Sequence, residues 1–253
     1  MSRIFVTGDT HIPIDISKLS SRNFPEGKNL TKDDYVIILG DFGLLWSCEN
    51  RDWSYPKYNP NDKYWSNSEI YWRKWLEEKP WTTLFIDGNH ENFDRLNSYP
   101  VTEWHGGNVH QISDSIIHLM RGQVFTIDDQ TFFTFGGAQS HDRGTVTGTE
   151  DRDRGIIWWD EELANQYEMN EALENLSKYN FKVDYILTHC LPIEMITRLG
   201  LNGYDRTSSF LGEVKYKTTY KEWYCGHYHT DKYIGEHTTV MYQDVMEVKD
   251  EET

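Results

Sequence analysis

Short runs of β-branched and aromatic residues recur along the chain, and most of them stop at a glycine or a polar residue. Such runs predict strands. The predicted strands are residues 3–7, 35–39, 82–86, 123–127, 131–135, 183–188 and 222–225. Longer segments between some of them predict helices at 66–78 and at 160–179, the second with acidic residues in its first turn.

The order of these elements indicates the fold class. Strands and helices alternate early in the chain and a strand-rich stretch follows, which indicates an α/β protein with two sheets and helices outside them. A length of 253 residues favours a single domain over residues 1–253, with two small domains as the alternative. Two segments depart from this plan. Residues 46–65 predict an aromatic loop insertion, either a lid or a local core, and residues 247–253 predict an acidic tail that frays into solvent.

Five of the predicted strands end in the same kind of polar sequence. The carboxyl ends of neighbouring strands converge on one crevice of an α/β sheet, so we expect the polar side chains that follow these strands to lie together. These residues are Asp9, His11, Asp41, Asn89, His90, His189, His227 and His229.

Each polar strand end has a simpler explanation when it is taken alone. A single Gly-Asp is usually a turn or a helix cap, and a lone histidine is usually structural. Five repeats favour a shared site, because ionisable groups that are buried close together are costly unless a cation pairs with them. Ligands that are carboxylates, an amide and imidazoles, without cysteine, fit Mn²⁺, Fe or Zn²⁺, and Mn²⁺ is our leading choice.

The ordered set Asp-x-His, Gly-Asp, Gly-Asn-His-Glu, a later His and Gly-His-x-His resembles the motifs of the calcineurin-like metallophosphoesterases. The set spans positions 9 to 229. The resemblance implies a four-layer α-β-β-α sandwich of two mixed β-sheets flanked by helices. It also implies two metal sites, one formed by Asp9, His11, Asp41 and His229 and the other by Asp41, Asn89, His189 and His227.

The expected chemistry is hydrolysis of a phosphomonoester or phosphodiester by a metal-activated hydroxide that attacks phosphorus. Two divalent cations outweigh the two carboxylates by about +2, which attracts a phosphate dianion. The resemblance implies that His90 protonates the leaving oxygen or stabilises the transition state, and imidazole suits this role because it titrates near neutral pH. The alternative is that His90 only caps a turn.

Several residues near these motifs have less certain roles. The segment Gly40 to Trp46 lacks the Asp-Arg that protein phosphatases of this family carry after Gly-Asp, so phosphate contacts must come from elsewhere. His141 and Arg143, in a loop that follows two glycines, are candidate substrate contacts, although a plain strand-exit turn is equally open. The remaining expectations are a surface position for Arg121, a helix-start position for Glu91, and turns around His105 and His110.

The amino-acid composition limits the kinds of substrate and partner that we expect. A formal net charge of −16 counts against extended nucleic acid as a substrate. No run approaches the ~20 apolar residues of a membrane span, and three scattered cysteines fit a reducing compartment, so no membrane partner and a cytoplasmic location are expected. We expect a small-molecule or nucleotide phosphoester as substrate. A nuclease, a protein phosphatase and a non-catalytic protein-binding scaffold are the alternatives, and protein partners are unknown.

Overall fold

The computed structural model describes residues 1–46, 66–142, 154–155 and 157–249, and its strands form two mixed sheets. The first has seven strands in the order β13-β1-β2-β3-β6-β5-β4. Their bounds are β1 Ile4–Thr7, β2 Tyr35–Leu39, β3 Thr82–Ile86, β4 Val101–Trp104, β5 Gly107–Ser113, β6 Ile116–Leu119 and β13 Val245–Glu247. The second has six strands in the order β11-β12-β10-β9-β8-β7. Their bounds are β7 Gln123–Ile127, β8 Gln130–Phe135, β9 Tyr185–Thr188, β10 Glu222–Cys225, β11 Lys232–Gly235 and β12 Thr238–Val240.

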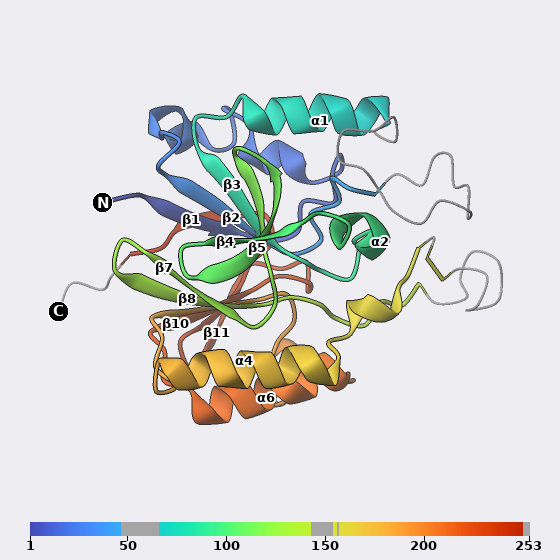
Figure 1. Ribbon diagram of the computed structural model, residues 1–253, viewed down its shortest axis with the longest axis vertical. Coiled ribbons are helices and arrows are strands. Elements are labelled where there is room, and N and C mark those ends of the chain that lie inside the picture. Colours follow the sequence, from blue (N-terminus) through green and yellow to red (C-terminus); the bar gives the residue numbers. More distant parts are fainter. Residues whose placement is uncertain (47–65, 143–153, 156, 250–253) are drawn as a thin grey trace.

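Helices lie outside the two sheets (Figure 1). The α-helices are α1 Asn67–Glu77, α2 Phe93–Leu96, α4 Gln166–Lys178, α5 Ile193–Ile196 and α6 Arg206–Lys217. Four 3-10 helices accompany them among the described residues: η1 Ile16–Leu19, η2 Pro25–Asn29, η3 Asp160–Glu162 and η4 Thr197–Leu199. Figure 1 shows α1 outside the first sheet and α4 and α6 outside the second.

Alternation along the strands produces this layering, because successive strand residues face opposite sides of a sheet. In β2, Ile37 and Leu39 pack between the sheets with Leu187 of the second sheet. Their neighbours Val36 and Ile38 pack on the other side in a cluster that includes Leu76 of α1. The α/β sandwich of two mixed sheets with flanking helices is therefore confirmed.

All of the predicted strands are present, but six further strands were missed. Strand β4 shows little of the hydrophobic pattern that predicts a strand, because its residues are largely exposed and it lies at the edge of its sheet. The turn expected around His105 is confirmed, because His105, with φ +48°, and Gly106, with φ +88°, form it, but strand β5 already begins with Gly107. The turn expected around His110 was therefore wrong, since this residue is buried in β5.

The predicted helix at 66–78 corresponds to α1, but the predicted helix at 160–179 was too long. Residues Asp160–Glu162 form η3, and α4 begins only after Asn165. The Asn165 side chain accepts a hydrogen bond from the Glu168 N–H at 3.0 Å, and the Glu168 carboxylate accepts one from the Asn165 N–H at 2.7 Å. This capping box fixes the helix start at the later position.

The predicted acidic tail begins too early. Glu247 pairs with β1 in the first sheet, and the Val248 N–H donates to the Ile4 carbonyl at 2.8 Å. Only residues 250–253 of the expected tail lie outside the described residues, as does the predicted loop from residue 47 to 65.

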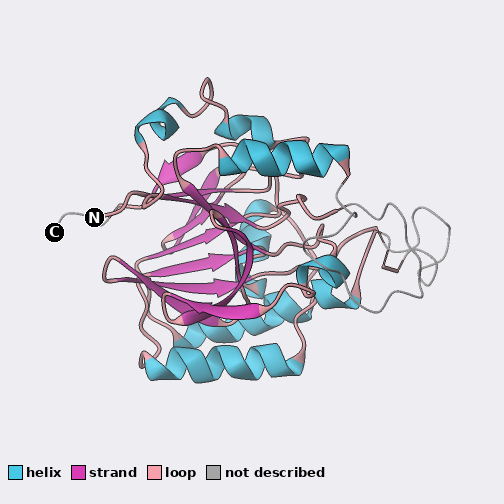
Figure 2. Ribbon diagram, turned by 45° about the horizontal axis from the view of Figure 1, so that its top comes forward, coloured by secondary structure: helices cyan, strands magenta, loops and turns pink. Residues whose placement is uncertain are grey.

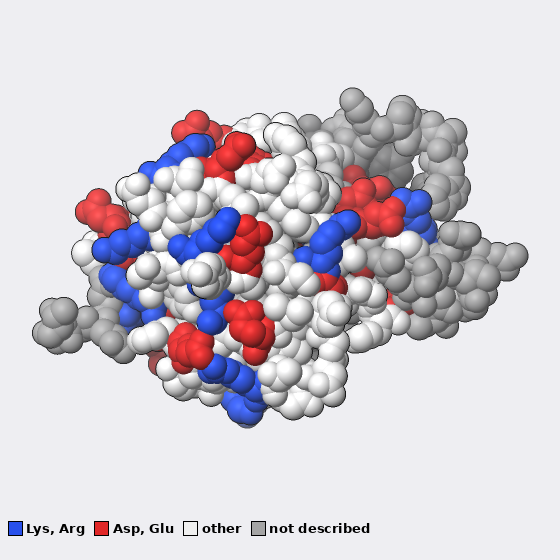
Figure 3. All heavy atoms as spheres, turned by 90° about the horizontal axis from the view of Figure 1, so that it is seen from below, with Lys and Arg blue, Asp and Glu red and all other residues white. Residues whose placement is uncertain are grey.

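The surface over α4 and α6 carries both signs of charge. Figure 3 shows Lys and Arg side chains interspersed with Asp and Glu on this side. Some of them are paired, as in Lys217 with Glu213 at 2.6 Å and Lys215 with Glu236 at 2.7 Å. This face therefore lacks the single-sign basic character of a polyanion-binding surface. Among the described helices, none is long and apolar enough to cross a membrane.

Candidate metal centre

Five loops meet at one end of the two sheets. Strands β1, β2 and β3 are parallel neighbours in the first sheet, and β9 and β10 are parallel neighbours in the second. Figure 2 shows several strands ending on the same side of the molecule. The loops that follow these strands carry all eight residues of the predicted cluster.

These loops form three overlapping groups of candidate ligands. In each group the ligand atoms lie within 4.8 Å of one another. The groups are Asp9, His11 and His229; His11, Asp41 and His90; and Asp41, His189 and His227. Asn89 joins the third group, because its Oδ1 is 3.2 Å from Nε2 of His189. The seven predicted ligands and His90 therefore lie in one cluster.

Asp41 stands between the two halves of this cluster. It is buried, and its Oδ2 is 3.2 Å from Nε2 of His11. Its Oδ1 is 3.3 Å from Nε2 of His189 and accepts a hydrogen bond from the His90 N–H at 2.7 Å. One carboxylate therefore contacts both sets of ligands, as a bridging ligand must.

Neighbouring backbone groups orient the candidate ligands. His189 Nδ1 is 2.7 Å from the carbonyl of Leu39, so the neutral ring donates from Nδ1 and leaves the Nε2 lone pair to face Asp41 and Asn89. Such hydrogen bonds are typical behind metal-binding histidines. The His227 N–H similarly donates to Oδ1 of Asp9 at 2.9 Å.

The second oxygen of Asp9 tests whether a cation fits. Asp9 is fully buried, and its Oδ2 accepts no hydrogen bond from any described residue, although His229 Nε2 lies 3.1 Å away. Buried carboxylate oxygens without a partner are rare because burial without a compensating bond is costly. Together with the carboxylate, amide and imidazole donors, this oxygen fits a divalent cation.

The carboxylates and histidines of the cluster shift one another's pKa values. Burial opposes protonation of the His189 ring, but Asp41 and Asp9 outweigh it and raise the pKa of His189 to about 9. Burial also opposes protonation of the His11 ring, but the hydrogen bond to Asp41 and the negative charge of Asp41 outweigh this effect and raise the pKa of His11 to about 9. Burial and the nearby His189 lower the pKa of His227 to about 4. Because a metal binds neutral imidazole, a metal bound at this cluster would displace protons from His189 and His11.

The loops approach one another so closely that several positions, Gly88 and Gly40 among them, admit only glycine. A Cβ at Gly88 would lie 2.0 Å from Oδ1 of Asp41, and one at Gly40 would lie 2.2 Å from Nδ1 of His189. Four candidate ligands also have left-handed backbone conformations that L-residues rarely adopt: His11, Asp41, His227 and His229. Backbone strain of this kind concentrates at functional sites.

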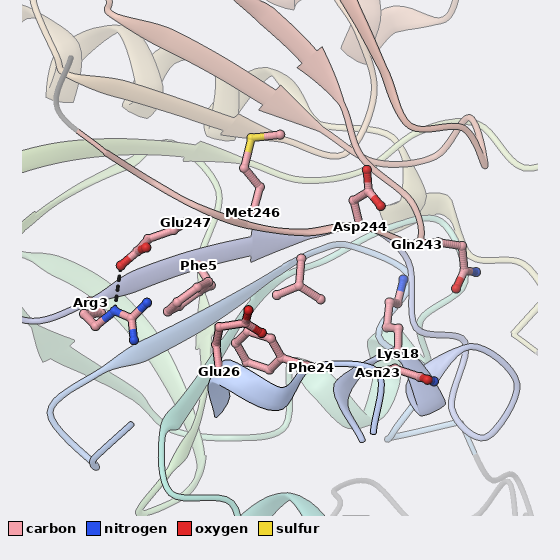
Figure 4. A pocket seen from close by; sticks show the side chains of 11 residues that line it. Arg3, Phe5, Lys18, Asn23, Phe24, Glu26, Gln243, Asp244, Met246 and Glu247 are labelled. Atoms are coloured by element: carbon pink, nitrogen blue, oxygen red, sulfur yellow. Dashed lines mark hydrogen bonds and ion pairs between the residues drawn. The ribbon is translucent and has the colours of Figure 1, made fainter. Parts of the chain in front are cut away.

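Lys18 supports the cluster and was missed in the sequence. It is buried, and its Nζ donates to the carbonyls of Gly8 at 3.1 Å and Asp9 at 2.6 Å, and to that of Tyr242. A cavity of about 580 Å³ lies beside it along β1 and β13. Figure 4 shows Lys18 and the Arg3–Glu247 ion pair in different parts of its lining. A single lysine in a short 3-10 helix gives no signal of such a role in the sequence.

Glu91 has a role that we did not predict. Helix α2 begins two residues later, at Phe93, and its N-cap is Asn92. The buried Glu91 carboxylate instead accepts a hydrogen bond from the Phe42 N–H at 2.7 Å, which joins the loop after β3 to the loop that carries Asp41. Burial and then the charge of Asp41 raise the pKa of Glu91 to about 8.

Arg121 was expected at the surface, and this was wrong. Its side chain is buried, and its Nε donates to Oδ2 of Asp87 at 2.7 Å. Oδ1 of Asp87 is 3.2 Å from Nε2 of His118, and Nδ1 of His118 is 3.1 Å from Nδ1 of His110. This buried chain of polar groups lies directly behind Gly88 and holds the start of the loop that carries Asn89 and His90.

The same chain predicts a specific sensitivity to acid. Burial, followed by the nearby His118, lowers the pKa of His110 to about 3, whereas an unfolded histidine titrates near ~6.5. Because the folded pKa is depressed, stability from neutral His110 is present above pH ~6.5 and is lost as the pH falls towards 3. The free energy of unfolding, measured by urea titration, should fall between pH 7.5 and pH 5 in both proteins. We expect this fall to be about 1–2 kcal/mol smaller for His110→Gln than for the wild type.

The exposed His105 provides the matched control for this measurement. The same substitution there, His105→Gln, should follow the wild type at both pH values. Equal losses in the wild type and in His110→Gln would show that His110 makes no contribution to acid sensitivity.

The candidate substrate residues are only partly described. His141 lines a cavity together with His227 and His229. Its neighbour Asp142 has Oδ2 3.4 Å from Nδ1 of His90. Arg143 lies outside the described residues.

Residues 2–231 match the family model of the calcineurin-like phosphoesterases, and the chain therefore belongs to this family. No curated protein was found to match the chain. Family membership indicates metal-dependent hydrolysis of phosphoesters, and the family typically has a dimetal centre.

Proposed function

We propose that this protein hydrolyses a phosphomonoester or phosphodiester of a small molecule or nucleotide at a centre of two divalent metal ions. The observation that carries the proposal is the buried Asp41 carboxylate, which contacts a different histidine with each of its oxygens. In this proposal one ion is held by Asp9, His11, Asp41 and His229, and the other by Asp41, Asn89, His189 and His227. Mn²⁺ is our choice, and Fe and Zn²⁺ suit the same donors.

The charges of these residues leave the loaded site positive. Asp9 and Asp41 are the two carboxylates of the ligand set, and Asn89 is a neutral ligand. When bound, two divalent cations leave an excess of about +2, attract the phosphoryl oxygens and lower the pKa of a water molecule towards neutrality. The ligands therefore favour a dianionic group over a neutral one.

We assign proton transfer to His90. Its N–H is held by Asp41 at 2.7 Å, and its ring centroid lies 5.6 Å from that of His11. The side chain is about one-third exposed, so the ring borders both the ligand cluster and the space that a substrate would enter. Protonation of the leaving oxygen by this imidazole is the step that the geometry supports best.

Asp142 is expected to orient His90. Its Oδ2 lies 3.4 Å from Nδ1 of His90, so the carboxylate favours the tautomer that carries a proton on Nδ1 and fixes the direction of the ring. We expect Asp142→Asn to lower kcat by about tenfold, with KM and metal content unchanged. The exposed Asp114→Asn serves as the control in the same steady-state assay. A kcat equal to that of the wild type would exclude this orienting role.

The alternatives have less support. The segment Gly40 to Trp46 lacks the Asp-Arg of protein phosphatases, and the net charge of −16 opposes binding of extended nucleic acid. A non-catalytic scaffold is not expected to keep both carboxylates, all the histidines and a buried Asp9 Oδ2 that accepts no hydrogen bond from the described residues.

A substrate panel tests the proposal. The metal-reconstituted protein is assayed with an aryl phosphomonoester, an aryl phosphodiester, nucleotides, a phosphopeptide and DNA. We expect metal-dependent turnover of the small esters and nucleotides above that of the phosphopeptide and DNA. Absence of turnover on every substrate, with two metals bound, would instead support the scaffold.

A further inference from the structure

A cavity of about 540 Å³ opens beside the candidate metal centre and shares His227 and His229 with it. Its volume lies within the range of small-molecule sites. Its other walls come from the loop that contains His141, from Cys190 ahead of α5, from Ile196 at the end of α5, and from residues 201–205 ahead of α6. A phosphoester held at the metal centre would therefore have this space next to it for its organic group.

The wall formed by residues 201–205 presents two large exposed side chains to the cavity. Leu201 is 44% exposed and Tyr204 is 73% exposed, and both line the cavity. The buried Ile196 and Cys190 extend the apolar lining inwards. Exposed large apolar side chains gathered beside a polar site are typical of ligand contacts.

A carboxylate fixes the position of this wall. Asp205 accepts a hydrogen bond from the Ser208 N–H at 2.7 Å through Oδ1 and another from the Gln139 N–H at 2.9 Å through Oδ2. The first bond caps α6, and the second joins the start of that helix to the loop that contains His141. The two walls are therefore held together before any ligand binds.

The charge of the lining limits what it can accept. Asp205 contributes a negative charge, and no lysine or arginine is among the described residues that line the cavity. A second phosphate group in this space would face Asp205 with no lysine or arginine among the described lining residues to offset its charge. The polar side chains of Gln139 and Asn202 nevertheless offer hydrogen bonds to an uncharged ring.

We propose that this cavity binds the organic group of the phosphoester substrate and that this group is an uncharged nitrogen heterocycle, such as a nucleobase, stacked on Tyr204. The proposal rests on the proposed function, because the phosphate of the same molecule lies at the metal centre. Tyr204 supplies the aromatic face, and Gln139 and Asn202 meet the polar edge of the ring. The favoured substrates thus carry one phosphate group and one base.

The test compares substrates that differ only in the base. The four nucleoside 5′-monophosphates and ribose 5-phosphate are assayed with the wild type, with Tyr204→Ala, and with Tyr216→Ala, which removes a 91% exposed tyrosine of α6 outside the cavity. At least one nucleotide should exceed ribose 5-phosphate in kcat/KM by about tenfold, and Tyr204→Ala should remove this advantage mainly through KM. The kcat/KM of Tyr204→Ala for ribose 5-phosphate, which lacks a base, should stay within about twofold of the wild-type value. The kcat/KM of Tyr216→Ala should stay within about twofold of the wild-type value for every substrate.

Direct binding separates this proposal from the proposed function. The affinity of the same nucleotides for the metal-reconstituted proteins is measured by calorimetry, which requires no turnover. If no ester is hydrolysed but Tyr204→Ala weakens nucleotide binding about tenfold, the cavity assignment stands and the proposed function fails. If esters are hydrolysed but nucleotides show no advantage over ribose 5-phosphate, or the advantage survives Tyr204→Ala, the cavity assignment is wrong.

Discussion

Asp41→Asn should lose at least one of the two metal ions and lower kcat by about a thousandfold or more. Asp41 is the carboxylate that contacts both halves of the ligand cluster, through His11 and through His189. The substitution removes one negative charge and replaces an oxygen with an amide nitrogen, which cannot bind a cation. It also weakens the contact that holds the His90 N–H at 2.7 Å.

The control for this variant is Asp34→Asn. Asp34 is also buried, and its Oδ1 accepts a hydrogen bond from the Arg3 N–H at 2.7 Å, but it is not among the candidate ligands. Metal content by elemental analysis and kcat on an aryl phosphate should change for Asp41→Asn and stay near wild type for Asp34→Asn. Two retained ions together with a kcat within tenfold of the wild type would contradict the bridging assignment.

His90→Ala should keep both metal ions and lower kcat by about 10²–10⁴-fold on esters with a poor leaving group. The ring is absent from both proposed ligand sets, so its removal leaves the metals in place, whereas proton delivery to the leaving oxygen is lost. An alkyl phosphate needs this proton, and a nitrophenyl phosphate needs it much less, because its leaving oxygen is a weak base. The loss in kcat should therefore be larger for the alkyl ester.

The matched control is His105→Ala, because His105 is exposed and is absent from the candidate ligand groups. Its kcat on both esters should equal that of the wild type. If His90→Ala lowers kcat equally for both esters, His90 does not act as the proton donor. If kcat is unchanged on both, His90 has no part in turnover.

The sequence predicts best what depends on local pattern. The composition of residues Tyr35–Leu39 alone predicts a buried strand. The polar residues that follow neighbouring parallel strands must lie close together, because these strands end at the same edge of the sheet. The order of motifs from Asp9 to His229 then adds a family resemblance. These two signals together identified the residues of the cluster.

The sequence does not reveal the roles of side chains whose contacts come from distant parts of the chain. Arg121 is an ordinary arginine until Asp87, 34 positions earlier, lies beside it in the core. Glu91 was interpreted from its neighbours in sequence, but its hydrogen-bond partner is Phe42, 49 positions away. Strand β4 is exposed, so its pattern carries no hydrophobic alternation to detect.

The most direct test of the account is a metal titration of the protein after chelation, with bound Mn²⁺ and hydrolysis of an aryl phosphate measured on the same samples. The account predicts two ions per chain and turnover that rises as the sites fill. It also predicts that Asp41→Asn binds at most one ion tightly and stays inactive. A wild-type protein that saturates with two ions yet hydrolyses no phosphoester, or one that hydrolyses esters at full rate without metal, would contradict it.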